Sequence, residues 1–220
     1  MPTRRRSPTA TSRFAYGSGR THHPAGFKTA LFVGIITNSS VGKIDLFLGV
    51  NDSGNADTVG IWNAGTGLNV SPSTTTIVSP ALVSYGLTST NYNWTPVNAT
   101  NDPTATSFDI DGGGGTDYFL SFSIPFSDIV AQLAAKGITG IDQKATFSYV
   151  IATSTQGNAL NQDLNGVGAS YNTSSTWATL GVLSDPTQPV AAVPEVNPAL
   201  AVVLLRLVIT SGGNGARVAQ

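Results

Sequence analysis

The stretch Tyr118-Phe119-Leu120-Ser121-Phe122-Ser123-Ile124 decides the fold class of this chain. Its even-numbered residues are all large and apolar, and two of its three odd-numbered residues are serines. Alternation with a period of two gives an extended strand one apolar face and one polar face. The sequence therefore predicts a β-strand over residues 118–124 whose even-numbered side chains enter a core.

The residues after this strand predict one short helix. Pro125 ends the strand, Ser127 is placed to act as the N-cap, and Asp128 falls in the first turn, where the helix dipole favours a negative charge. An apolar stripe follows at helical spacing, and Gly137 stands where a C′ glycine ends a helix. The stripe consists of Ile129, Val130, Leu133 and Ala134.

Further short strands are predicted on both sides of this unit, joined by turns rich in Gly, Asn, Ser and Asp. Many short strands and a single helix indicate a mostly-β fold. We expect a single antiparallel β-sandwich, of the jelly-roll or immunoglobulin-like kind, over residues 28–184. The other predicted strands are 31–36, 44–50, 58–62, 75–78, 81–87, 92–97, 104–110, 145–153 and 176–183.

The composition excludes several classes of protein. The chain has 220 residues, of which 40% are hydrophobic and 10% are charged, so it can fill a core and does not have the composition of a disordered protein. Cysteine is absent, which excludes disulfides, thiolate chemistry and Cys-ligated metals. No apolar run reaches the length of a membrane span.

The net charge of −1 conceals an uneven distribution. Residues 1–27 hold five arginines and no acid, whereas residues 29–198 hold three lysines and all twelve acids, a net charge of −9. An acidic domain repels phosphate backbones, so we expect no nucleic-acid partner. Residues 1–27 lack periodicity and are expected to be disordered or extraneous to the domain.

A glycine-rich loop carries the sharpest chemical signal. Asp109, Asp111 and Asp117 flank four consecutive glycines at 112–115, and carboxylates on such a loop can converge on a hard cation. The loop resembles the D-x-D-G loops of extracellular calcium-binding repeats, which implies Ca²⁺ as a cofactor. The alternative is a Gly/Asp turn between two strands that needs no metal.

The aromatic residues offer a second candidate site. Trp62, Trp94 and Trp177, with Tyr92 and Tyr171, are a candidate stacking platform for sugar rings, because aromatic faces bind the apolar side of a pyranose. Each lies in or beside a predicted strand, however, so the alternative is packing in the core or at its edge.

Enzymatic constellations are weak, and we expect a protein that is not an enzyme. The two histidines, His22 and His23, are adjacent in the N-terminal segment, which excludes a Ser-His-Asp triad and a His-based zinc site. The polar run 158–165 is a candidate for binding sugar hydroxyls or completing a metal shell. Its alternative is a loop that satisfies its own backbone.

The C-terminal region resembles a sorting signal. Residues 185–198 are Pro-rich and are expected to form a linker. Val193-Pro194-Glu195 followed by an apolar stretch resembles the PEP-CTERM signal of exported bacterial proteins, although Val196 stands where that family has a second proline. The resemblance implies an extracellular or cell-envelope location. It also implies membrane contact only through the tail at 199–220, before that tail is processed.

The remainder of the chain, through the segments 42–48, 116–126 and 161–166, looks like extracellular domains that commonly carry this tail. A strand that ends in Ile124-Pro125 and runs into a short helix is also similar to family 9 carbohydrate-binding modules and DOMON-like β-sandwiches. These resemblances imply a non-catalytic exported protein of the cell envelope or extracellular matrix, whose partner is polysaccharide or matrix. The alternatives are a carbohydrate-binding module and, third, a polysaccharide-active enzyme that uses aspartates.

Overall fold

The computed structural model describes residues 30–38, 40–52, 58–100, 117–154 and 175–187, together with the backbone of four short strands nearer the chain ends. Within these residues strands predominate, and they are accompanied by the helix α1 (Phe126–Ala135) and one 3₁₀ turn, η1 (Pro72–Thr74). The prediction of a mostly-β fold with one short helix is therefore confirmed.

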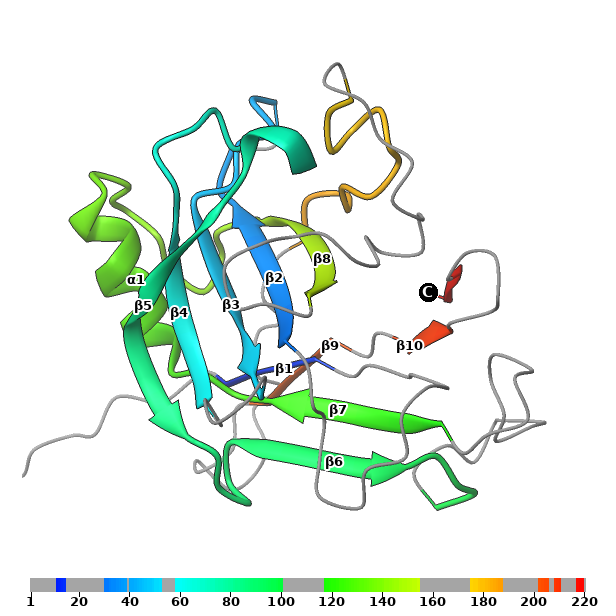
Figure 1. Ribbon diagram of the computed structural model, residues 1–220. Coiled ribbons are helices and arrows are strands. Elements are labelled where there is room, and N and C mark those ends of the chain that lie inside the picture. Colours follow the sequence, from blue (N-terminus) through cyan, green and yellow to red (C-terminus); the bar gives the residue numbers. More distant parts are fainter. Residues whose placement is uncertain are drawn as a thin grey trace, which may run out of the picture.

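Five strands form the main sheet, in the order β5-β4-β3-β2-β8, and all neighbours are antiparallel (Figure 1). Along the chain, β2 pairs with β3 and β3 pairs with β4, so these three strands form two successive hairpins. The strand β8 comes much later in the chain and closes the sheet beside β2. The bounds are β2 (Ala30–Ile36), β3 (Leu46–Asn51), β4 (Thr58–Ala64), β5 (Ile77–Gly86) and β8 (Ser148–Ser154).

Both faces of this sheet are buried, as the central strand β2 shows most clearly, since all seven of its residues are buried. Its odd-numbered side chains enter one core and its even-numbered apolar side chains enter another. We call the first the helix-side core. Its buried members are Leu31, Val33, Ile35, Leu46, Leu48, Val50, Val59, Ile61, Leu120, Phe122, Ile124, Ile129, Leu133, Phe147 and Ile151.

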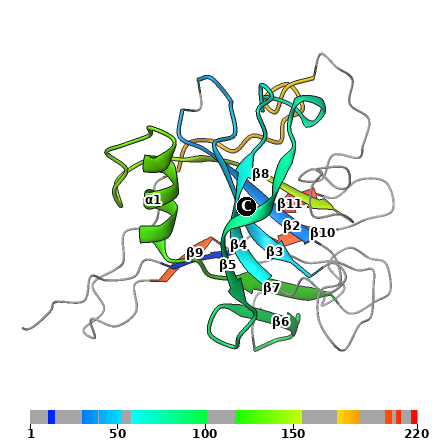
Figure 2. The ribbon, with the colours of Figure 1, turned by 60° about the vertical axis from the view of Figure 1, so that its left-hand side comes forward.

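The helix-side core is covered by α1 and by a separate antiparallel pair, β6 (Tyr92–Pro96) and β7 (Tyr118–Phe122). Figure 2 shows α1 standing on one side of the main sheet. Phe122 and Leu133 share this core, as the alternating strand and the helical stripe predict. The sandwich arrangement itself stays a prediction, because β6 and β7 form a sheet of only two strands among the described residues.

The opposite core, which we call the turn-side core, is built from aromatic rings over glycines. Phe32 lies opposite Gly49, and Phe47 lies opposite Gly34, in the β2–β3 register. A Cβ at Gly49 would lie 3.0 Å from the Phe32 ring, and one at Gly34 would lie 3.1 Å from the Phe47 ring. Because glycine has no side chain, the rings can lie over these strands, and Phe32 meets Trp62 edge to face at 5.2 Å.

A turn segment completes the turn-side core, and the predicted strand over 176–183 is wrong. Residues 175–183 contain only turns and irregular backbone. The Thr176 and Thr179 hydroxyls bond to nearby backbone groups, and Gly181 has a φ of +68°, which an extended strand does not allow. Trp177 and Val182 from this segment are buried in the turn-side core.

The two ends of α1 differ in how well the sequence predicts them. The N-cap is Pro125, and Ser127 lies inside the first turn, so the predicted Ser127 N-cap is wrong. The C-terminus follows the prediction: Gly137 has a φ of +81° and donates to the Ala134 carbonyl, while Ile138 donates to the Leu133 carbonyl. These two hydrogen bonds form a Schellman motif.

The strands predicted at 75–78 and 81–87 form one strand, β5, which runs through Pro80. The β4–β5 register shifts between Ile61 and Asn63, so an irregularity accommodates the extra residues of β5 opposite Trp62. Pro80 is tolerated because β5 is the edge strand of the sheet.

Near the chain ends, β1 (Thr11–Phe14) pairs in parallel with β9 (Val202–Leu205), and β10 (Val208–Thr210) pairs with β11 (Arg217–Ala219). The sequence predicts no strand in residues 1–27, and β1 differs from that expectation. The backbone of Thr187 bridges to that of Phe147, and the predicted domain boundaries stay a prediction. None of the helices described is long and apolar enough to cross a membrane.

Candidate functional site

The structure describes one of the three aspartates predicted to bind calcium. Asp117 precedes β7 and is only 1% exposed, and its backbone carbonyl accepts a hydrogen bond from the Val97 N–H at 2.8 Å. Asp109, Asp111 and the glycines between them lie outside the described residues. The described ranges contain no group of three or more acidic or histidine side chains that could hold a metal. Calcium binding by this loop stays a prediction.

The three tryptophans do not share one surface. Trp62 and Trp177 are 3% and 0% exposed in the turn-side core, and the Trp177 indole N–H donates to the Asn69 carbonyl at 3.1 Å. Trp94 belongs to β6 and is half-buried against the helix-side core, on the opposite side of the main sheet. Tyr171 and the polar run 158–165 lie outside the described residues.

Trp94 stacks on an aromatic neighbour from the adjacent strand. Its ring lies 4.9 Å from that of Tyr118, and the two planes are 6° apart. Leu120 stands directly opposite Trp94 and Tyr118 opposite Pro96, so the stacked rings are diagonal neighbours on the inner face of the β6–β7 pair. Of the three predicted indoles, Trp94 is the one that keeps exposed surface in the structure.

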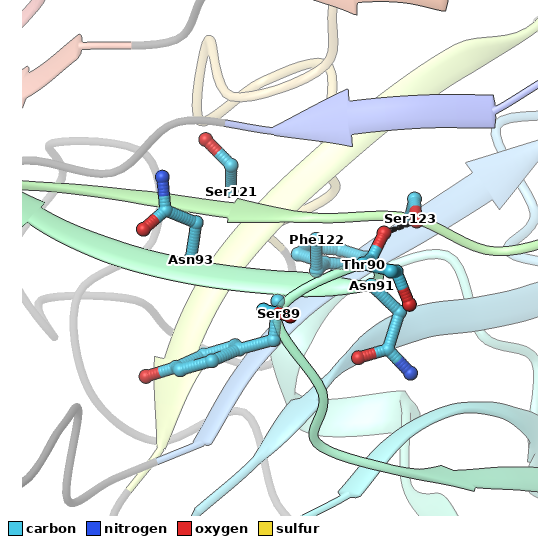
Figure 3. Close-up of a pocket in the computed structure, with 8 residues that line it drawn as sticks. Ser89, Thr90, Asn91, Asn93, Ser121, Phe122 and Ser123 are labelled. Atoms are coloured by element: carbon cyan, nitrogen blue, oxygen red, sulfur yellow. Dashed lines mark hydrogen bonds between the residues drawn. The ribbon is translucent and has the colours of Figure 1, made fainter.

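A small pocket of about 90 Å³ lies where the β5–β6 turn meets the end of β7 (Figure 3). We call it the hairpin pocket. Its lining is dominated by hydroxyl and amide side chains, and two aromatic residues contribute to it. The lining residues are Ser89, Thr90, Asn91, Tyr92, Asn93, Ser121, Phe122 and Ser123.

The turn side of the hairpin pocket is held by internal hydrogen bonds. The Asn91 side chain accepts from the Thr88 N–H at 2.8 Å and donates to the Gly86 carbonyl at 2.9 Å. The Ser123 N–H donates to the Asn91 carbonyl at 2.9 Å, and the Ser123 hydroxyl donates to the Thr90 carbonyl at 3.4 Å. Asn91 and Ser123 are therefore engaged in building the turn and joining it to β7.

The strand side presents polar groups that are not engaged in this way. Asn93 and Ser121 stand directly opposite each other in the β6–β7 register. Alternation along the strands turns both side chains to the outer face, on the same side of the two strands (Figure 3). The opposite, apolar face carries Tyr92 and Leu120. Within the described part of the chain, neither the Asn93 amide nor the Ser121 hydroxyl makes a side-chain hydrogen bond.

The described lining of the hairpin pocket carries no formal charge. Among the residues that the structure describes, it includes no Asp, Glu, His, Lys or Arg. Hydroxyl and amide groups can donate and accept hydrogen bonds, but they do not supply the acid–base pair that hydrolytic chemistry uses. The arrangement therefore suits the binding of a small uncharged polar molecule.

Sequence reasoning misses the hairpin pocket because its two halves are far apart in the chain. The residues Asn93 and Ser121 become neighbours only through the pairing of β6 with β7. The available signal is the polar character of alternate positions, 91 and 93 at the start of one strand and 121 and 123 at the end of the other. That pattern identifies an outward face but does not identify its partner strand.

The ionisable contacts elsewhere in the described structure tie elements together. The Tyr85 hydroxyl on β5 donates to the Asp128 carboxylate on α1. Burial, and then the hydrogen bond and the charge of Asp128, hold the pKa of Tyr85 well above its usual value. On the same side of the sheet, the Lys136 ammonium donates to the Asn63 side-chain oxygen at 2.5 Å. Burial lowers the pKa of Lys136.

No protein-family model matches this chain, and neither a curated protein nor a solved structure is significantly similar to it.

Proposed function

We propose that this chain is a non-catalytic domain of an exported bacterial protein, and that it works by binding at the cell envelope or in the extracellular matrix. The observation that carries the proposal is the chemistry of the hairpin pocket, whose described lining offers hydroxyl and amide groups and no acid or base. The tail that begins at Val193-Pro194-Glu195 supports export through its resemblance to a sorting signal.

The proposal is tested by location and by sedimentation. The bacterium that encodes the chain is made to express it with an affinity tag, and its cytoplasmic, envelope and medium fractions are probed for the tag. Purified protein is then mixed with isolated envelopes and with cell-free matrix, and the mixtures are centrifuged beside an unrelated β protein of similar charge. We expect the tag outside the cytoplasm and co-sedimentation with one of the two materials. A purely cytoplasmic chain that stays in the supernatant would contradict the proposal.

The second candidate is a carbohydrate-binding module. The specific observation in its favour is the outward pair of Asn93 and Ser121 in the lining of the hairpin pocket, because amide and hydroxyl groups can bond to the hydroxyls of a sugar. Trp94 is the predicted sugar-binding tryptophan that retains exposure. Trp94→Ala is expected to weaken retention on a neutral polysaccharide if its ring takes part in binding, and to leave retention unchanged if it serves packing alone.

A polysaccharide-active enzyme is the third reading. A glycosidase needs two carboxyl groups roughly 5–9.5 Å apart around the scissile bond, and the described lining of the hairpin pocket offers none. Incubation with neutral polysaccharides should therefore release no new reducing ends. A steady rise in reducing ends that is abolished by Asp→Asn substitution would favour the enzyme over the binding domain.

A further inference from the structure

We infer that the hairpin pocket is a binding subsite for a single uncharged sugar ring of a neutral polysaccharide, with Asn93 and Ser121 as its recognition groups. This inference rests on the proposed binding function and adds the place and the chemical class of the ligand. Its support comes from four features of the pocket: two recognition groups without a side-chain hydrogen bond to the described residues, an uncharged described lining, its size and a fixed rim.

The recognition groups are chemically suited to neighbouring hydroxyls. An Asn amide carries one acceptor oxygen and two N–H donors, and a Ser hydroxyl both donates and accepts. Asn93 and Ser121 lie on adjacent strands, which are about 4.8 Å apart in a sheet. One side of a sugar ring, with hydroxyls on successive carbons, can therefore reach both side chains at once.

Neutrality selects the ligand class. Phosphate, sulfate and uronate groups are bound through charge-assisted hydrogen bonds, usually from Arg or Lys. The pocket lining that the structure describes has no cation, and residues 29–198 carry a net charge of −9. An anionic polymer would be repelled by the domain and would find no compensating partner in the pocket.

Size limits how much of a polymer enters. A pocket of about 90 Å³ is far smaller than the clefts of roughly 300–1,000 Å³ that enclose drug-sized ligands. One ring, or the end of a chain, can occupy it while the rest of the polymer stays in solvent. Such a site binds weakly, and repeated rings along a polymer raise its apparent affinity.

The rim is fixed before any ligand arrives. Asn91 fastens the turn through its hydrogen bonds to Thr88 and Gly86, and Ser123 joins the turn to β7. A binding surface held in this way loses less conformational entropy on association than a loose loop does. The two asparagines therefore have different roles: Asn91 shapes the pocket, and Asn93 faces the ligand.

The test is affinity gel electrophoresis of the full chain. Neutral dextran, galactomannan and xyloglucan are cast into separate gels, and alginate serves as the anionic probe. Wild type is compared with the double variant Asn93→Ala/Ser121→Ala, with Asn93→Asp, and with Ser84→Ala. Ser84 is an exposed serine on β5, outside the pocket, and provides the matched control. Thermal melts confirm that each variant is folded.

We expect retardation of the wild type by at least one neutral polysaccharide, at least a tenfold weaker interaction for the double variant, and unchanged binding for Ser84→Ala. Asn93→Asp keeps the shape but replaces the N–H donors with a charge, so it should also bind less. Retardation that survives in a folded double variant overturns the pocket assignment and leaves the proposed function intact. Binding to alginate alone, or to no probe, overturns the inference whatever the outcome of the sedimentation test.

Discussion

Asn91 and Asn93 are the same residue type two positions apart, yet the structure gives them different tasks. The Asn91 side chain accepts one hydrogen bond from the backbone of its own turn and donates one to it, and the Asn93 side chain is turned outward beside Ser121. The tryptophans divide in the same way, since Trp177 is enclosed with its N–H satisfied while Trp94 keeps an exposed part. At the residue scale, the role depends on the partner that folding supplies.

Phe122 allows a direct test of the helix-side core. Its ring is 1% exposed and packs in the core that joins the main sheet, β7 and α1. Phe122→Ala should lower the free energy of unfolding by about 3–5 kcal/mol, because it removes buried surface and leaves a cavity. Urea denaturation measures the change. A loss under about 1 kcal/mol would show that the inward face of β7 is misassigned.

Tyr85 makes stability depend on pH on the alkaline side. Its pKa is raised in the folded state, so its contribution is fully present below the unfolded value of about 10 and is lost as the pH rises above that value. The melting temperature of the wild type should therefore fall more steeply between pH 9 and 11.5 than that of Tyr85→Phe. The pKa of Tyr149 is also raised, by burial, and this residue is present in both proteins. If the melting temperatures of the two proteins fell in parallel over this pH range, the Tyr85–Asp128 contact would be excluded as the cause of the alkaline loss of stability.

The strands of the main sheet could be predicted from the sequence because each combines β-branched or aromatic residues with bounding turns. β2, β3 and β4 lie within a few residues of their predicted ranges. The turn at 176–183 could not be predicted, since its apolar residues are spaced like those of a strand. The reversal of the chain there depends on Thr176, Thr179 and Gly181. The hairpin pocket could not be predicted either, because it depends on the long-range pairing of β6 with β7.

The helix α1 offers a test at both ends. Gly137 has a positive φ with open space around its Cα, so Gly137→Ala strains the backbone without a clash and should cost about 1 kcal/mol of stability. Gly86→Ala is the matched control, because Gly86 also has open space but no positive φ. Ser127→Ala should change stability by less than about 0.5 kcal/mol, since Ser127 is not the N-cap. A larger loss of unfolding free energy in Ser127→Ala would indicate that Ser127 does act as the N-cap, as the sequence predicts.

The loop before β7 is expected to bind calcium weakly, in the millimolar range of extracellular modules. The motivation is the spacing of Asp109, Asp111 and Asp117 around four glycines. Binding to the folded state alone stabilises it by RT ln(1 + [L]/Kd), so a tenfold excess over Kd adds roughly 1.4 kcal/mol. Thermal melts with and without 10 mM CaCl₂, repeated in Asp111→Asn, measure the effect. A midpoint that responds to sodium chloride as much as to calcium identifies a glycine turn without a metal.

At the scale of the whole molecule, the main sheet separates two cores with different coverings. One face carries α1 and the β6–β7 pair, and the other carries the turn segment at 175–183. The outer face of β6–β7 is consequently free to be polar, since only its inner face is needed for packing. The proposed binding surface thus lies on the outer face of the same strand pair whose inner face covers the helix-side core.

The chain ends should separate from this body under protease. The pairs β1–β9 and β10–β11 each consist of two short strands, and two-stranded ribbons contribute little stability of their own in water. The main sheet instead has five strands with apolar side chains buried on both faces. Low concentrations of thermolysin should therefore cut within residues 1–27 and 188–220 first and leave a resistant fragment that contains Tyr118–Phe122. Mass spectrometry of the fragments identifies the cuts, and equal protection of the ends and of β7 would show that the terminal strands belong to the stable body.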